Sequence, residues 1–164
     1  MSSRNFLSAS VISLWAVSGY AQQTATNSAA APPPSSPSYG SPVTLTQAKF
    51  LAAFVEAEAV RKNEKDVVIA IVSPDGELVY FQKMDDATYV SIQLAQSKAI
   101  MAARYRMASG NLPPSGATGL PDAIGLQGGQ PIVYQGKTIG AIGVSGAETN
   151  DVVFGNLAIE ALNK

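Results

Sequence analysis

Residues 131–147 read PIVYQGKTIGAIGVSGA, and this stretch decides the fold that the chain is expected to adopt. Two apolar runs rich in β-branched residues flank Gln135-Gly136, whose glycine favours a tight turn. The stretch therefore predicts a β-hairpin with strands at residues 131–134 and 137–144.

A second hairpin is predicted earlier in the chain. Residues 67–72 read VVIAIV, an apolar run without alternation, which indicates a strand buried on both faces. Pro74-Asp75-Gly76 follows as a turn signal, and residues 78–84 resume as the partner strand.

Three helices are predicted around these hairpins. Thr44 and Gln47 have capping-box spacing ahead of a helix at about residues 45–62. Small residues recur on one face of a second helix, residues 89–107, which suits close packing against another backbone. A third helix, residues 150–162, closes the chain.

The order of elements is helix, strand, strand, helix, long loop, strand, strand, helix. Hairpins make antiparallel pairs, whereas a doubly wound parallel sheet needs strand–helix–strand runs. The sequence therefore predicts an α+β fold with an antiparallel sheet packed with helices. The loop, residues 111–127, is rich in Gly and Pro, and such a length is typical of a segment that covers a site.

The composition excludes several kinds of site. The 164 residues include no histidine and no cysteine, and 11 Lys plus Arg stand against 12 Asp plus Glu. A disulfide framework, a cysteine nucleophile, a Ser-His-Asp triad and a zinc site of thiolates or imidazoles are therefore excluded within one chain. A net charge of −1 gives no electrostatic reason for tight binding to nucleic acid, so no nucleic-acid partner is expected.

The N-terminal part of the chain has a different composition. Residues 1–21 carry one cation, Arg4, then a mostly apolar run, and end in small residues at Ala21, a pattern typical of a secretory signal peptide. The apolar run is shorter than the ~20 residues that span a bilayer, so no stable membrane insertion is expected after cleavage. We expect an exported protein, periplasmic or secreted, with a disordered Pro/Ala/Ser-rich tether at residues 22–43 and a folded unit at residues 44–164.

Several motifs occur together in an order that resembles one known family. They are Asp75-Gly76, Met84-Asp85, Ser91 with Lys98-Ala99, Gly128-Gly129-Gln130-Pro131, the IGAIGVSGA run at residues 139–147, and Asp151. The set resembles the GlcG/HbpS-like family of haem-binding proteins, which also occurs as the C-terminal domain of PduO proteins. The resemblance covers residue 44 to about residue 162. It implies a profilin-like α+β fold, assembly into homo-oligomers and, in some members, extracytoplasmic haem binding or haem breakdown.

Haem iron would have few side-chain ligands in this chain. The iron is usually held by His, Cys, Met or Tyr, and only the last two types are present. The family commonly carries a threonine three residues after the lysine of its second helix, and Met101 stands there in this chain. Met101 either ligates softly or packs in the core. Met101 or Tyr105, one turn further on, is expected near the macrocycle.

Lys98 is a single charge in a small and apolar stretch of the second predicted helix. It could reach solvent by extending its stem, form a structural ion pair with Asp85, or clamp a ligand carboxylate at the mouth of a pocket. Asp85 is itself a candidate ligand-binding residue, although capping of the following helix is the preferred role for it and Asp86.

The glycine-rich motifs have two interpretations. Gly128 and Gly129 would let the backbone approach a macrocycle, Pro131 beside them is a further candidate for ligand contact, and the amides of Ser145 and Gly146 would contact a ligand. For the glycines of residues 139–147, the alternative is close packing of strand and helix together with a tight turn.

The leading hypothesis is an exported module that binds haem or a related tetrapyrrole between the second helix, the long loop and Gly128-Gly129-Gln130-Pro131. One alternative is an enzyme that degrades haem or metabolises a small carboxylate, for which the sequence supplies no convincing acid–base pair. Another is an oligomeric sensory or accessory subunit that binds a partner protein. No metal site formed by side chains alone is expected.

Overall fold

The computed structural model of the protein describes residues 36–147 and 150–164. The predicted signal peptide and most of the predicted tether lie outside these residues. Within the described part of the chain, no helix combines the length and apolarity needed to cross a membrane.

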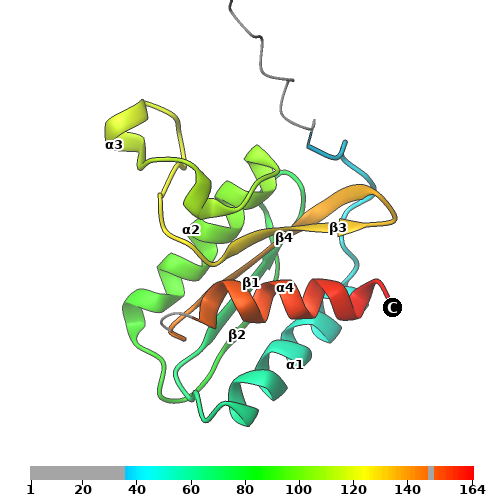
Figure 1. The fold of residues 1–164 in the computed structure, drawn as a ribbon, viewed down its shortest axis with the longest axis vertical. Coiled ribbons are helices and arrows are strands. Elements are labelled where there is room, and N and C mark those ends of the chain that lie inside the picture. Colours follow the sequence, from blue (N-terminus) through cyan, green and yellow to red (C-terminus); the bar gives the residue numbers. More distant parts are fainter. Residues whose placement is uncertain (1–35, 148–149) are drawn as a thin grey trace, which may run out of the picture. The chain divides into compact units, whose positions relative to one another are not determined.

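The elements follow the predicted order (Figure 1). They are α1 (Leu45–Arg61), β1 (Val68–Val72), β2 (Leu78–Lys83), α2 (Tyr89–Tyr105), η1 (Ser109–Asn111), α3 (Ser115–Thr118), β3 (Gly129–Tyr134), β4 (Lys137–Ser145) and α4 (Asp151–Leu162). The capping box of Thr44 and Gln47 is present at the start of α1. Helix α2 ends two residues earlier than predicted because Arg106 adopts a left-handed conformation with φ 53°.

The four strands form one antiparallel sheet in the order β2-β1-β4-β3, which confirms the predicted α+β class. The central pair is β1 and β4, with Ala70 opposite Gly143. All five residues of β1 are buried, as its unbroken apolar run predicts.

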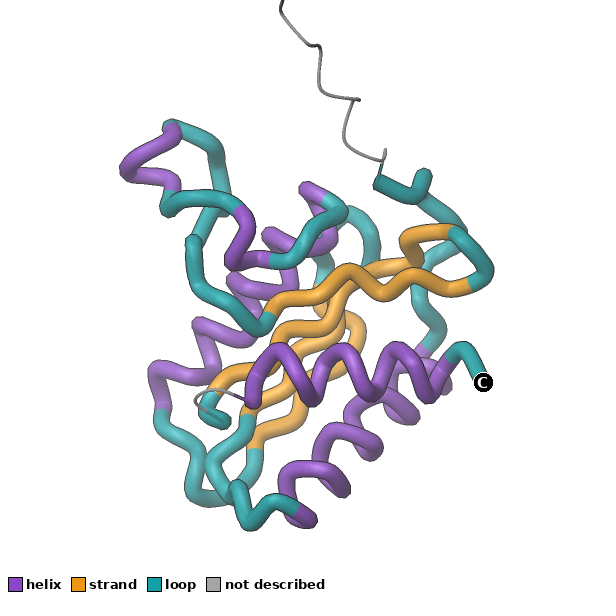
Figure 2. Tube along the Cα trace, in the orientation of Figure 1, coloured by secondary structure: helices purple, strands orange, loops and turns teal. Residues whose placement is uncertain are grey.

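The two faces of the sheet are covered by different helices (Figures 1 and 2). Helices α1 and α4 share one face with the larger side chains of the core, among them Leu51, Ile69, Ile71, Ile142 and Phe154. Helix α2 covers the other face, where the core consists mainly of small side chains, among them Ala95, Ala99 and Ala102 of the helix and Ala70 and Ala141 of the sheet. The small side chains allow α2 to lie closer to the sheet.

At two glycines, the backbone of the sheet contacts the backbone of α2. A Cβ at Gly143 of β4 would lie 2.0 Å from the carbonyl oxygen of Ala95, and one at Gly129 of β3 would lie 2.1 Å from that of Lys98. No side chain can occupy either space, so the backbones of β3 and β4 contact the backbone of α2. The packing interpretation of Gly143 is confirmed.

The folded unit begins before Thr44. Residues 37–43, here called the strap, run beside the start of β4, where the Gly40 amide donates to the carbonyl of Thr138 at 2.9 Å. The Tyr39 hydroxyl donates to two carbonyls at the end of α2, at 3.1 and 2.9 Å. The expected boundary at Thr44 is therefore too late. Proline and serine disfavour helix here, but an extended segment can still extend a sheet.

Replacing Gly143 with alanine should lower the free energy of unfolding by about 1–3 kcal/mol, because the new methyl group must displace the α2 backbone. Urea denaturation measures the change. Gly116→Ala is the matched control, since nothing lies within 4 Å of its Cβ position. Equal stability of Gly143→Ala and the control would contradict the close contact.

Candidate functional site

Lys98 is buried, with 4% of its surface exposed, at the point where α2 crosses the end of β4. Its ammonium donates to Asp151 Oδ2 at 2.7 Å and to the carbonyl of Val144 at 3.0 Å. Asp151 Oδ1 accepts the Ala147 amide at 2.9 Å. This ion pair joins α2, the end of β4 and the start of α4.

The position of Lys98 corrects three expectations. The side chain does not reach solvent, its ion-pair partner is Asp151 rather than Asp85, and its ammonium is occupied inside the fold. The physical reason is that α2 lies so close to the sheet that a lysine side chain on its inner face cannot extend to solvent. A carboxylate must neutralise it there, because an unpaired buried charge is costly.

Burial raises the pKa of the Asp151 carboxyl above its ordinary value of 3.8. The ammonium of Lys98 and the Ala147 amide oppose this effect by stabilising the carboxylate. Lys98 and the Ala147 amide thus offset part of the free-energy cost of removing the Asp151 carboxylate from water.

The glycines predicted to contact a ligand lie against neighbouring backbone in the fold. Cβ atoms at Gly128 and Gly146 would lie 2.5 Å from the carbonyl oxygen of Val144 and 2.1 Å from that of Asp66. Ser145 is buried in β4, opposite Val68. These residues surround the end of β4 and pack against neighbouring backbone.

The remaining predicted residues are dispersed. Met101 is fully buried, and Asp85 is exposed in the connection between β2 and α2, where its carbonyl accepts a hydrogen bond from Lys83. Pro131 lies half-buried in the edge strand β3. Only Tyr105 lies against the long loop, donating its hydroxyl to the carbonyl of Pro121 at 2.7 Å.

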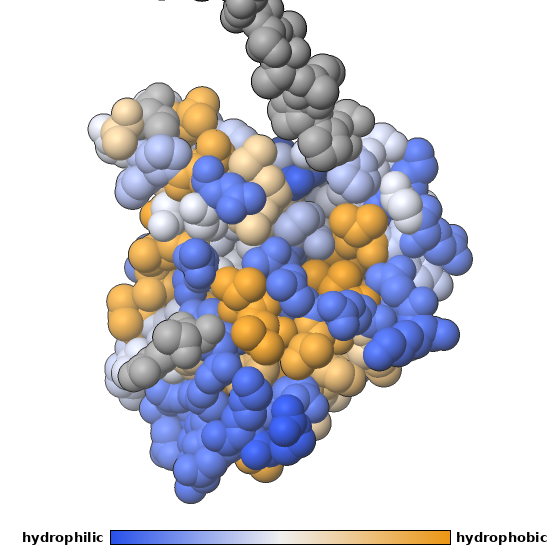
Figure 3. Space-filling model, in the orientation of Figure 1, coloured by the Kyte–Doolittle hydropathy of each residue, from blue (hydrophilic) through white to orange (hydrophobic). Residues whose placement is uncertain are grey.

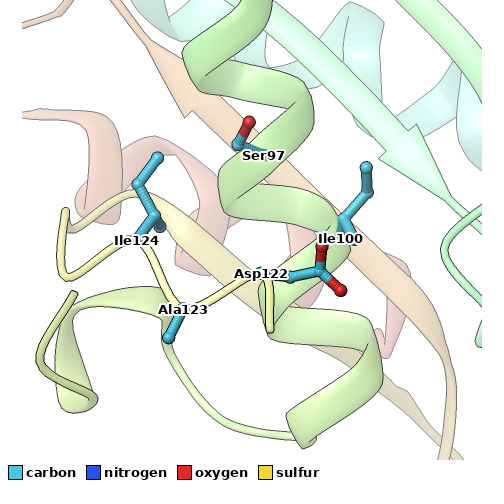
Figure 4. A pocket seen from close by; sticks show the side chains of 5 residues that line it. All are labelled: Ser97, Ile100, Asp122, Ala123 and Ile124. Carbon is cyan, nitrogen blue, oxygen red and sulfur yellow. The ribbon is translucent and has the colours of Figure 1, made fainter. Parts of the chain in front are cut away.

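A pocket of about 220 Å³ opens between α2 and this loop (Figure 4). Ser97 and Ile100 line it from the helix, and Asp122, Ala123 and Ile124 line it from the loop. The pocket therefore combines apolar side chains with polar groups on its rim.

The loop is fastened to α2 by two consecutive residues of the helix. Arg104 Nη1 donates to Asp122 Oδ2 at 2.6 Å, and Tyr105 donates to Pro121. The Arg104 and Asp122 side chains are 44% and 37% exposed, so a dissolved anion can compete for the guanidinium. We call this ion pair the latch.

A second, smaller pocket of about 130 Å³ lies between the loop, β3 and α4. Its lining residues are Ala108, Gly110, Asn111, Gln127, Gln130 and Val152. The first pocket is lined by α2 and the loop, whereas Gln130 of the Gly128-Gly129-Gln130-Pro131 segment lines only the second, so neither is the single pocket predicted between all three. Both are smaller than the ~300–1,000 Å³ of ordinary small-molecule sites.

Sequence reasoning missed the roles of Asp151, Arg104 and Asp122. Several acidic residues could have neutralised Lys98, and their sequence positions do not identify the one that does. The sequence does contain an indication of the latch, because Asp122 is the single charged residue of the predicted loop, residues 111–127. A charge in such a loop indicates a partner on the adjoining helix.

Among residues 36–147 and 150–164, no group of three or more acidic side chains could hold a metal ion. The apolar pocket and the exposed guanidinium of the latch are features that could instead receive an organic ligand bearing a carboxylate.

Comparison with known proteins identifies relatives over most of this unit. The profile of the family described as "Haem degrading protein HbpS-like" matches residues 43–154. An uncharacterized 15.0 kDa protein of Citrobacter freundii is 35% identical over 115 residues, which cover 63% of this chain and 80% of the relative. Protein GlcG of Escherichia coli is 35% identical over 94 residues, which cover 54% of this chain and 70% of GlcG.

Solved structures share the fold. The Klebsiella pneumoniae protein ORFY is 26% identical with a TM-score of 0.67, over 75% of this chain and 92% of ORFY. A Streptomyces reticuli HbpS double mutant is 24% identical with a TM-score of 0.68, over 83% of this chain and 99% of that one. A PduOC–haem complex is 24% identical with a TM-score of 0.67, over 74% of this chain and 96% of PduOC.

Replacing Lys98 with methionine should lower the free energy of unfolding by about 3–5 kcal/mol, because the Asp151 carboxylate would stay buried without its cation. Urea denaturation measures the loss, with Lys49→Met on exposed α1 surface as the control. The double variant Lys98→Met/Asp151→Asn should regain part of the stability. A double variant less stable than Lys98→Met would contradict the pairing.

The raised pKa of Asp151 also predicts a pH dependence. The folded chain holds this proton more tightly than the unfolded chain, so the stability contributed by Asp151 falls as the pH rises from 3.8 through the raised value. The measurement is the difference in unfolding free energy between the unmodified protein and Asp151→Asn at several pH values. A difference that grows with pH over this window would show the opposite shift.

Proposed function

The chain belongs to the HbpS-like family of haem degrading proteins, and from this premise we propose that it binds haem or a related tetrapyrrole on the surface formed by α2 and the long loop. The single observation that carries the proposal is the latch between Arg104 and Asp122 beside an apolar pocket. The haem of the PduOC complex supports the choice of ligand by family relationship.

The residues present fit such a ligand in two respects. Ile100 and Ile124 offer apolar contact to the flat face of a macrocycle. Arg104 offers a guanidinium, whose planar donor geometry suits the carboxylates of a tetrapyrrole. Because the pocket holds only about 220 Å³, the macrocycle must lie across its opening or displace the loop.

Exchange of carboxylates provides a way to displace the loop. A ligand carboxylate that binds Arg104 releases Asp122, while the hydrogen bonds from Tyr105 to Pro121 and from Ser109 to Leu126 still hold the two ends of this part of the loop. Moving the loop uncovers Ala123, which is 4% exposed, and enlarges the apolar surface beside Ile100. Binding and loop movement are thereby coupled through one guanidinium.

The chain offers few side chains that could coordinate the iron strongly. It contains no His or Cys, and Met101 is sealed in the interior. The residues therefore fit a ligand held by its face and its carboxylates. Haem would supply the iron chemistry when bound, while the chain supplies orientation and limits access of water.

Breakdown of haem is the second candidate function, and the family's description favours it. Within the part of the chain that the structure describes, the buried acid–base pair is Lys98 with Asp151, and both groups are occupied in the fold. A binding role therefore agrees better with the geometry.

Export and self-assembly belong to the same proposal. The signal-peptide pattern of residues 1–21 supports a periplasmic or secreted location. Apolar side chains gather over α4 and β3 (Figure 3), and Val153 on α4 is 40% exposed. This apolar surface supports a homo-oligomer in which a second copy covers it.

Haemin titration of the full chain, followed by the Soret band, tests the site. Asp122→Asn should tighten binding roughly two- to fivefold because it frees Arg104, and Arg104→Gln should weaken binding by a similar factor. Adding a reductant to the same samples tests breakdown, which would appear as a time-dependent loss of the band.

The control is the ion pair of Arg61 and Glu58, which has the same 2.6 Å separation and lies on α1. Arg61→Gln should leave haemin affinity unchanged. The latch proposal fails if Arg104→Gln and Asp122→Asn shift the affinity in the same direction, or if neither shifts it.

A further inference from the structure

A cavity of about 380 Å³ lies on another part of the protein, between the strap, the start of α1 and the β3–β4 hairpin. Its lining residues are Gly40, Ser41, Pro42, Thr44, Gln47, Tyr134, Gln135, Lys137 and Ile139. We propose that this cavity is a second binding site, for a small molecule that carries one carboxylate on an apolar or aromatic body.

The size and floor of the cavity suit such a body. Its volume lies within the ~300–1,000 Å³ of ordinary small-molecule sites, unlike the two pockets beside the long loop. Tyr134 is half-buried and offers part of its ring to the cavity, while Ile139, which is 6% exposed, lies at its base. Pro42 of the strap adds a rigid apolar wall.

The charge of the cavity selects an anion. Lys137 is the single charged residue of its lining, and none of the lining residues is acidic. The Lys137 ammonium donates to Ser38 Oγ at 2.7 Å. An ammonium has three donors, so this bond leaves two of them for a ligand carboxylate.

The polar groups at the start of α1 do not supply this selectivity. Thr44 and Gln47 bond one another, since the main-chain N–H of Gln47 donates to Thr44 Oγ1 at 3.2 Å and the main-chain N–H of Thr44 donates to Gln47 Oε1 at 3.0 Å. The site therefore depends on Lys137 for charge and on Tyr134 with Ile139 for shape.

Occupancy of the cavity would also stabilise the strap. Gly40, Ser41 and Pro42 form one wall, and the strap is held to β4 by hydrogen bonds that include Gly40 to Thr138. A ligand that contacts this wall and Lys137 together joins the strap to the hairpin. Binding should therefore slow amide exchange in the strap.

Benzoate and benzamide are matched probes because they share a shape and differ in charge. In NMR titrations of the isotopically labelled full chain, benzoate should shift the amide signals of Gly40 and Ile139 saturably. Benzamide should bind roughly two- to fivefold more weakly, and added salt should weaken the binding of benzoate alone.

Lys137→Met should reduce benzoate affinity to that of benzamide while leaving benzamide affinity unchanged. Lys49→Met, an exposed lysine on α1, should change neither. Ser38→Ala removes the strap contact but keeps the charge, so it should preserve the preference for benzoate. This comparison separates loss of charge from loosening of the strap.

Three results would overturn the proposal: no saturable shift with benzoate, equal affinity for the two probes, or full benzoate affinity in Lys137→Met. The haemin titration is independent of this outcome, because Lys137→Met leaves Arg104 and Asp122 intact. Failure of one site is therefore distinguishable from failure of the other.

Discussion

Direct contact between the backbone of α2 and the backbones of β3 and β4 is the constraint on which the rest of the structure depends. Gly143 and Gly129 leave space for the carbonyls of Ala95 and Lys98, and no larger residue fits there. The contact fixes both the distance of α2 from the sheet and the rotation of the helix about its own axis. It thereby determines which side chains of the helix face inward and which reach the loop.

The charged residues of α2 divide according to this rotation. Lys98 faces the sheet and is neutralised by Asp151, which joins the start of α4 to the interior. Arg104 faces outward and holds the loop through an exposed ion pair that an anion can exchange. The inner pair contributes to the fold, and the outer pair is the one suited to respond to a ligand.

Much of the fold could be predicted from the sequence, whereas the partners of its charges could not. The pattern of apolar residues along each strand and helix is local, so the hairpins and the α+β class could be predicted from the sequence. The pairing of Lys98 with Asp151 depends on tertiary placement across 53 positions of sequence. The strap was not predicted, because its Pro-rich composition indicates only that it forms no helix. Its hydrogen bonds depend on tertiary structure: β1 pairs with β4 only as far as Ala141, which leaves Thr138 free to accept the Gly40 amide.

Hydrogen exchange of the full chain with and without haemin tests the central claim most directly, because it locates the binding surface without substitutions. The account predicts that haemin changes exchange in α2 around residues 97–105 and in the loop at residues 115–126, and leaves α1 unaffected. Changes confined to α1 and β2, with none in the loop, would contradict it.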